Sequence, residues 1–159
     1  MIRGLGIALF AAVVAGDQLS KSWIVSYLGD PERHAVQSIA PFFDLVLVRN
    51  RGVSFGLFNG DSAVNSILLS VVAGVVVLGL FVWLWRTRSA LVAAATGLVS
   101  GGAVGNVIDR LRFGGVTDFL DFHWGEWHFP AFNLADSAIT VGVGLLLIDG
   151  LLSRRESRK

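Results

Sequence analysis

The chain reads Phe129-Pro130-Ala131-Phe132-Asn133-Leu134-Ala135-Asp136-Ser137-Ala138-Ile139 at the start of an apolar segment that continues to Leu152. This stretch places one carboxylate, Asp136, at the head of a segment long enough to cross a membrane. An ionisable group is costly to keep there, so we interpret Asp136 as a functional residue. The alternative role is structural. Asn133 is a typical helix N-cap, and an acid three residues later would bind free N–H groups at the helix start.

The composition indicates an integral membrane protein. Of the 159 residues, 53% are hydrophobic and only 16% are charged, and the mean hydropathy is +0.66, far from the balance of soluble domains. The sequence contains 0 cysteines, which excludes disulfides, thiolate catalysis and cysteine metal sites. The formal net charge of +1 gives no indication of a nucleic-acid partner, and we expect none.

Apolar segments predict an all-α membrane fold with four transmembrane helices, at about residues 2–28, 62–85, 89–111 and 134–152. The beginning of the first segment could also be a cleavable signal peptide, but apolarity resumes after Lys21 and three more spans follow. We expect one membrane domain over residues 1–159, with the polar segments at about 29–61 and 112–133 outside the membrane.

The third span differs from the others in its small residues. Gly97, Gly101 and Gly105 recur every four positions, which lets neighbouring helices approach closely. We therefore expect this helix to be central. The span at 62–85 carries no charge and is expected to face lipid.

Cations in the loops and tails set the expected orientation. Loops rich in Lys and Arg mark the cytoplasmic side of a membrane protein. We therefore expect both termini to be cytoplasmic and the polar segments to be extracytoplasmic. The cations on the cytoplasmic side of this arrangement are Arg3, Arg86, Arg88, Arg154, Arg155, Arg158 and Lys159.

The two polar segments are expected to form a small β-rich element. Residues 42–48 are rich in β-formers, Asn50-Arg51-Gly52 is a turn signal, and residues 53–58 alternate apolar with small or polar side chains. This pattern predicts a hairpin. Residues 113–128 form a second extended segment, rich in aromatic and acidic residues.

Asp118, in the second polar segment, is the expected partner of Asp136. Two carboxylates that converge repel each other, so one should hold a proton while the other stays ionised. In the scheme of aspartic proteases, the ionised group takes a proton from water while the protonated group donates one to the scissile carbonyl or amide nitrogen. The two carboxyl groups then titrate as a pair, so their pKa values belong to the pair and not to either residue. Asp121 lies close by in sequence and competes with Asp118 for this role.

Other polar residues have a structural alternative beside the functional one. Asn106, Asp109 and Arg110 fall on one side of the third helix, where a network that anchors the bundle is favoured over direct chemistry. Asp17 and Lys21, four residues apart, are interpreted in the same way. Asn50 and Gly52 could serve only the turn, although Asn50 could also hold a substrate main chain.

Four further hypotheses remain open. His123 and His128 could bind a metal, but their spacing matches no zinc-peptidase motif, and interfacial aromatic residues explain the segment more simply. Lys21 could activate a serine, but no serine has the sequence context of a nucleophile. A proton-coupled transporter or a structural subunit would also contain membrane charges, but no inverted repeat is evident and the charges lie near the helix ends.

Five sequence blocks together resemble the bacterial lipoprotein signal peptidase family, also known as signal peptidase II. The resemblance spans the whole chain, and the blocks occur in the order and spacing of that family. They are Asp17-Gln18-Leu19-Ser20-Lys21, Asn50-Arg51-Gly52-Val53-Ser54-Phe55, Gly105-Asn106-Val107-Ile108-Asp109-Arg110, Val116-Thr117-Asp118-Phe119 and Phe132-Asn133-Leu134-Ala135-Asp136-Ser137.

The resemblance implies an aspartic endopeptidase of the bacterial cytoplasmic membrane with a β-rich cradle outside it. Such an enzyme cuts prolipoproteins just before a diacylglyceryl-modified cysteine, contacts membrane lipid and is inhibited by globomycin. It implies that Asp118 and Asp136 are catalytic. Matching support or substrate-contact positions are Asp17, Lys21, Asn50, Gly52, Asn106, Asp109, Arg110, Asn133 and Ala135. We expect no metal, no cofactor and a monomer.

Overall fold

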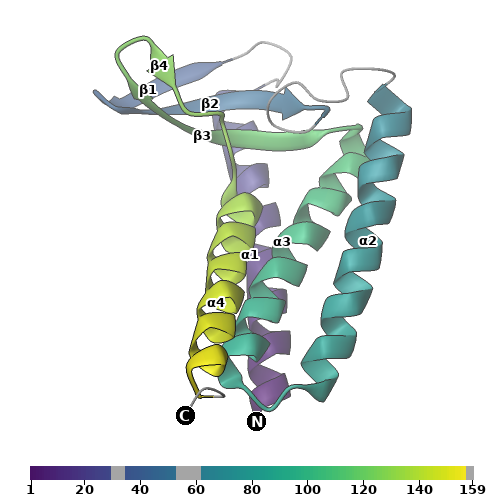
Figure 1. Cartoon of the computed structure of the whole chain (residues 1–159). Coiled ribbons are helices and arrows are strands. Elements are labelled where there is room, and N and C mark those ends of the chain that lie inside the picture. The colour runs from purple at the N-terminus through teal and green to yellow at the C-terminus, as the bar shows by residue number, and fades with distance from the viewer. Residues whose placement is uncertain (30–34, 53–61, 157–159) are drawn as a thin grey trace.

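The computed structural model describes residues 1–29, 35–52 and 62–156. Long helices stand side by side, and a small antiparallel sheet lies across one end of them (Figure 1). The first helix begins, and the last helix ends, at the opposite end from the sheet (Figure 1). The described chain is thus divided into an apolar helical layer and a more polar β layer.

The helical layer contains α1 (Ile2–Leu28), α2 (Ser62–Arg86), α3 (Ala90–Phe113) and α4 (Leu134–Glu156). All 4 are long and apolar enough to cross a membrane. α1 continues as one helix through Asp17, where the apolar run of the sequence is interrupted. The predicted fold of four membrane helices with a small β element is therefore confirmed.

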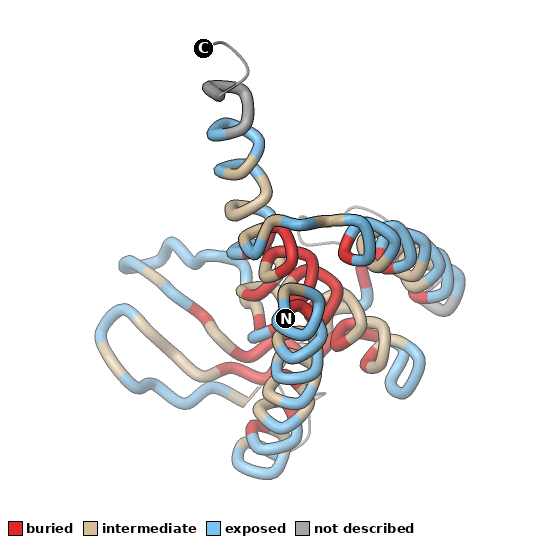
Figure 2. The backbone as a smooth tube through the Cα atoms, turned by 90° about the horizontal axis from the view of Figure 1, so that it is seen from below, coloured by how far each residue is buried: buried red, intermediate tan, exposed pale blue. Residues whose placement is uncertain are grey.

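α3 lies at the centre of the bundle, as its small residues predict. In its membrane window 61% of the residues are buried, against 11% in each of the other three helices. Figure 2 shows the buried residues gathered in the middle of the bundle. A Cβ at Gly97 would collide with the backbone of Gly6 in α1, and a Cβ at Gly102 would collide with the backbone of Ala135 in α4. Because Gly97 and Gly102 have no side chain, α1 and α4 can pack directly on α3.

α2 forms an outer wall that packs mainly against α3. Ser66 near its start donates a hydrogen bond of 2.8 Å to the carbonyl of Gly114, just after the end of α3. The rest of the helix presents apolar side chains outward, as a lipid-facing surface requires. The exposed side chains include Val64, Ile67, Leu68, Val71, Val72, Val75, Val76, Leu78 and Val82.

The sheet contains β1 (Val36–Ala40), β2 (Phe43–Asn50), β3 (Val116–Trp124) and β4 (Trp127–His128), in that order. Each neighbouring pair is antiparallel. The β2–β3 ladder joins two segments that are distant in the sequence. It pairs Asp44 with Asp121 and Val48 with Asp118, and a register shift lies between these two pairs.

The described strand pairing covers only one half of the hairpin that the sequence predicts. β2 ends at the expected turn, Asn50-Arg51-Gly52, but within the described residues its partners are β1 and β3. Residues 53–58, the other half of the expected hairpin, lie outside the described residues. A local turn signal cannot reveal a distant partner such as β3, because the β2–β3 ladder joins segments that are far apart in the sequence. The extended segment expected at 113–128 contains β3 and β4.

One face of the sheet packs on the last turns of α1. Ile24 and Leu47 are fully buried there, and Phe119 of β3 is 6% exposed. Successive side chains of a strand point to opposite faces, so Phe119 on this face directs Asp118 to the other. This small apolar core therefore fixes the direction in which Asp118 points.

Candidate active site

Asn133 and Asp136 form a reciprocal cap at the start of α4. Asn133 Oδ1 accepts a hydrogen bond of 3.0 Å from the Asp136 N–H, and Asp136 Oδ2 accepts one of 3.2 Å from the Asn133 N–H. The second carboxylate oxygen, Oδ1, accepts from Asn106 Nδ2 of α3 at 2.8 Å. The cap therefore holds the carboxylate and aims it at α3, so the structural and functional interpretations of Asp136 are compatible.

Asp118 is joined to this cap by the same asparagine. Asn133 Nδ2 donates to Asp118 Oδ1 at 2.7 Å, and Asn50 Nδ2 of β2 donates to Asp118 Oδ2 at 2.9 Å. The Asp118 residue is 2% exposed and Asn133 is fully buried. A single buried side chain thus links β3 to α4 and brings the carboxylate pair, Asp118 and Asp136, together.

A cavity of about 270 Å³ lies in front of the carboxylate pair. Arg110 of α3, which is half-buried, supplies the positive charge among its described lining residues. The cavity can therefore hold a water molecule and a peptide carbonyl beside two acids and one guanidinium. The lining residues are Asn50, Gly52, Ala73, Ala103, Asn106, Arg110, Val116, Asp118, Asp136 and Ile139.

Asn50 and Gly52 serve both of the roles considered for them. The Gly52 N–H donates to Asn50 Oδ1 at 3.2 Å, which is the turn chemistry that the sequence indicates. Because Asn50 Oδ1 accepts this bond, the Nδ2 group of the same amide is directed to Asp118. Both residues also line the cavity.

Burial raises the pKa of Asp118 from 3.8 to about 7. Removal from water disfavours the charged carboxylate, and the negative charge of Asp136 adds to this effect. Hydrogen bonds from Asn50 and Asn133 and the positive charge of Lys21 act in the opposite direction. Near neutral pH, Asp118 is therefore poised to hold a proton and to release it.

Lys21 of α1 lies behind the carboxylate pair. Its Nζ is 2.8 Å from Asp17 Oδ2 and 3.1 Å from Asp109 Oδ2, and it donates to Asn106 Oδ1 at 3.1 Å. All four side chains are buried. Because Lys21 occupies the oxygen of the Asn106 amide, the Nδ2 group faces Asp136. Lys21 therefore positions the donor that holds Asp136.

Asp17 ties α1 to the start of α4. Its Oδ1 accepts a hydrogen bond of 3.1 Å from the backbone N–H of Ala135, so Ala135 contributes through its main chain. A Cβ at Gly105 of α3 would lie 2.5 Å from Asp17 Oδ2, which shows how closely the carboxylate approaches that helix. Each predicted support residue thus lies in the cavity wall or directly behind it.

Two residues of this network were not predicted from the sequence. Gln18 Nε2 donates to Asp109 Oδ1 at 3.0 Å and to the Gly105 carbonyl at 3.2 Å. The Thr117 N–H donates to Asp109 Oδ2 at 2.9 Å, which anchors β3 one residue before Asp118. Gln18 follows Asp17 and Thr117 precedes Asp118 in the sequence. This proximity to predicted site residues is the sequence signal that points to them.

Asp121 is directed away from the carboxylate pair. It stands three positions after Asp118 in β3, on the opposite face of the strand, and its Oδ2 lies 2.8 Å from His128 Nδ1. His123 Nε2 lies 3.4 Å from Asp44 Oδ2, and the two histidine rings stack with centroids 5.0 Å apart. Across the described part of the chain, no group of three or more His, Asp or Glu residues is arranged to hold a metal ion.

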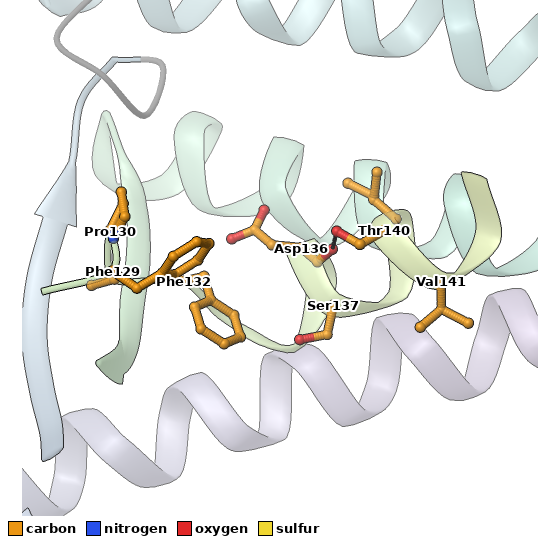
Figure 3. Close-up of a pocket in the computed structure, with 9 residues that line it drawn as sticks. Phe129, Pro130, Phe132, Asp136, Ser137, Thr140 and Val141 are labelled. Atoms are coloured by element: carbon orange, nitrogen blue, oxygen red, sulfur yellow. Dashed lines mark hydrogen bonds between the residues drawn. The ribbon is translucent and has the colours of Figure 1, made fainter. Parts of the chain in front are cut away.

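A larger apolar groove of about 580 Å³ meets the carboxylate pair at Asp136. Figure 3 shows Phe132 on one side of the Asp136 carboxylate and Thr140 on the other, with Val141 further along α4. Asp136 and Ile139 line both this groove and the smaller cavity. The remaining lining residues are Phe129, Pro130, Ala131, Phe132, Ser137, Thr140 and Val141.

Comparisons with known proteins agree on one family. A family model described as signal peptidase (SPase) II matches residues 9–152. The lipoprotein signal peptidase of Syntrophotalea carbinolica is 49% identical over 138 residues, which cover 86% of this chain and 84% of that protein. The lipoprotein signal peptidase of Burkholderia cenocepacia is 46% identical over 155 residues, which cover 97% of this chain and 90% of that protein.

Solved structures show the same architecture. A bacterial membrane enzyme determined by the in meso method at 2.3 Å resolution superposes with a TM-score of 0.79 at 29% sequence identity, covering 98% of this chain and 92% of that one. The residues that the family model matches contain every block from Asp17 to Asp136, and the two relatives each align with most of this chain. This chain belongs to the signal peptidase II family.

Proposed function

We propose that this protein is a membrane aspartic endopeptidase that cleaves the signal peptide from prolipoproteins immediately before a diacylglyceryl-modified cysteine. The lipoprotein signal peptidases that it resembles support the substrate class. The observation that carries the chemistry is the carboxylate pair, because Asp118 and Asp136 share Asn133 and line one cavity.

In the proposed reaction Asp136 is the general base and Asp118 is the general acid. Asp136 lies in the first turn of α4, where the helix dipole favours a negative charge. It takes a proton from water, and the water oxygen attacks the scissile carbonyl carbon. Asp118, whose pKa is raised to about 7, donates its proton to the substrate as the peptide bond breaks.

Other residues have proposed supporting roles. Arg110 lines the cavity with the carboxylate pair and is suited to bind the carbonyl oxygen as negative charge develops on it. Asn50 and Gly52 hold the substrate main chain, and Asn106 and Asn133 position the two acids. The surrounding residues Asp17, Lys21, Asp109 and Ala135 support these amides and fix the helices.

The apolar groove beside Asp136 is suited to the apolar part of such a substrate. Its walls combine Phe129 and Phe132 with Ile139 and Val141 of α4, so a chain in the groove would reach Asp136 directly. We propose that the protein acts as a monomer in contact with membrane lipid, without a metal or cofactor, in one peptidase domain. Globomycin-type inhibitors are expected to compete for this site.

We propose that the protein lies in the bacterial cytoplasmic (inner) membrane with both termini in the cytoplasm. The described cations Arg3, Arg86 and Arg88 lie at the end of the helices opposite the sheet (Figure 1), and cationic loops mark the cytoplasmic side. The carboxylate pair adjoins the sheet and therefore lies near the extracytoplasmic face.

The direct test uses purified protein in detergent with two matched substrates, a diacylglyceryl-modified prolipoprotein and its unmodified precursor. We expect cleavage of the modified substrate before the modified cysteine, with the same rate in the presence of a metal chelator. Mass spectrometry of the products identifies the bond. Cleavage that depends on metal would contradict the carboxylate mechanism, and a folded protein that cuts neither substrate would contradict the proposed activity.

The cleavage rate is expected to fall above about pH 7. Asp118 must hold a proton to act as the acid, and its pKa of about 7 means that the proton is lost as pH rises through that value. The rate should then fall about tenfold per pH unit. Asn50→Ala removes a hydrogen bond that lowers this pKa, so its alkaline limb should move to higher pH. Rate profiles between pH 5 and 10 check both expectations, and coincident limbs would contradict the assignment.

A further inference from the structure

A second polar cavity, of about 280 Å³, lies between α1, α3 and the sheet. Neither member of the carboxylate pair is among its lining residues, although Asp109 and Thr117 border it from the network behind that pair. It opens beside the last turn of α3. The residues that line it are Gln18, Lys21, Ser22, Val25, Arg49, Asp109, Arg112, Phe113 and Thr117.

Two guanidinium groups are held on one aromatic ring at this cavity. The Cζ atoms of Arg49 and Arg112 lie 4.7 and 5.1 Å from the centroid of the Phe113 ring. Arg49 Nη1 also donates to Thr117 Oγ1 at 2.6 Å. The ring and the hydroxyl fix these planar groups without neutralising them. Two like charges near one ring repel each other, so an anion that contacts both groups in the cavity would be favoured.

The carboxylates near this cavity have other partners. Asp109 accepts hydrogen bonds from Gln18 and the Thr117 N–H and pairs with Lys21. Lys21 is in turn flanked by Asp17. Among the ion pairs of the described residues, none joins Arg49 or Arg112 to an acid. Within the described residues, the two guanidinium groups at this cavity therefore have no carboxylate in an ion pair with them. A bound anion can accept their hydrogen bonds.

We propose that this cavity binds the phosphate of an anionic phospholipid headgroup. One guanidinium group can bind two phosphate oxygens through two parallel N–H···O bonds. The guanidinium groups of Arg49 and Arg112 both line this cavity. Phe113, 49% exposed, ends a membrane-spanning helix, which is the depth at which lipid phosphates lie. Val25 and the Phe113 ring offer apolar contact for the glycerol end of the lipid. This inference does not depend on the proposed peptidase activity.

The test measures lipid binding to the purified full chain in a non-ionic detergent by native mass spectrometry. The ligands are dioctanoyl phosphatidylglycerol, dioctanoyl phosphatidylcholine and inorganic phosphate. We expect the anionic lipid to form a one-to-one complex, and Arg112→Gln to weaken it by about tenfold or more, as loss of a charge-assisted pair implies. Arg112 is exposed, so this variant is expected to fold. Arg49→Lys keeps the positive charge but loses the planar set of N–H donors, so it should weaken binding less than Arg112→Gln does.

Arg86→Gln is the matched control, because Arg86 is an exposed arginine at the other end of the helices. It should change lipid affinity by less than about twofold, since surface charge away from the cavity contributes little. An equal loss in Arg86→Gln and Arg112→Gln would reduce the effect to general electrostatic attraction and overturn the proposal. Equal binding of phosphatidylcholine, or equal affinity for inorganic phosphate, would also overturn it.

Discussion

Replacing either member of the carboxylate pair is expected to lower the rate of prolipoprotein cleavage by about 10⁴-fold or more, because residues that act as one catalytic unit are each indispensable. Asp118→Asn removes the proton that the acid donates, and Asp136→Asn removes the base. Asparagine has nearly the same volume as aspartate, so neither substitution leaves a cavity. The amide oxygen introduced by Asp118→Asn can still accept a hydrogen bond from Asn50 or Asn133. Initial rates with a diacylglyceryl-modified substrate measure the loss.

Asp121→Asn is the matched control for that result. Asp121 is in the same strand as Asp118 and is also buried, but its carboxylate contacts His128 instead of the cavity. Its cleavage rate should stay within a few-fold of the wild-type rate. A loss in Asp121→Asn as large as that in Asp118→Asn would mean that the wrong aspartate has been assigned to the pair.

The second large effect is expected on stability. Lys21→Met should lower the free energy of unfolding by about 3–5 kcal/mol, because it leaves two buried carboxylates, Asp17 and Asp109, without their cation. Unfolding in detergent, followed by tryptophan fluorescence, measures this loss. Arg86→Gln removes an exposed cation and should change stability by less than about 0.5 kcal/mol.

A triple variant separates lost charge balance from lost packing. In Asp17→Asn/Lys21→Met/Asp109→Asn all three charges are removed, and the Asn at 17 can still accept from the Ala135 N–H. Replacing a whole buried ion network is often close to neutral, so most of the stability lost in Lys21→Met should return. A triple variant less stable than Lys21→Met would contradict the charge explanation.

Sequence periodicity was sufficient for the helical layer. The spans follow from long apolar runs, and the central position of α3 follows from Gly97 and the other small residues on it. The sheet was only partly predictable. Its extended segments could be recognised, but the β2–β3 ladder joins distant residues such as Asp44 and Asp121, and a local turn signal does not encode such a pairing.

For the candidate site, the sequence identified the residue types but not how they contact one another. Asp118 was one of two similar acids in a short segment. Strand alternation and the burial of Phe119 distinguish it from Asp121, and both depend on which face of the sheet meets α1. The role of Asn133 as a link between the two carboxylates could not be foreseen, because its side chain meets β3 only after the sheet has packed on the helices.

The orientation of Lys21 is a similar case. Its pairing with Asp17 follows from helical spacing, but its contacts with Asp109 and Asn106 depend on the close approach of α1 and α3. Gln18 cannot be singled out from the sequence, because a glutamine beside a charged residue has no distinctive pattern. Three-dimensional packing, and not residue type, decides which of these side chains reach the carboxylate pair.

Joint action of the two carboxylates is tested most directly by a single-turnover comparison of Asp118→Asn, Asp136→Asn and the double variant, with enzyme in excess over a diacylglyceryl-modified prolipoprotein. If the carboxylates act as one unit, the double variant should retain about the same residual rate as each single variant. Losses that multiply, so that the double variant is slower than either single variant by the full factor of the other, would show that the two acids act independently.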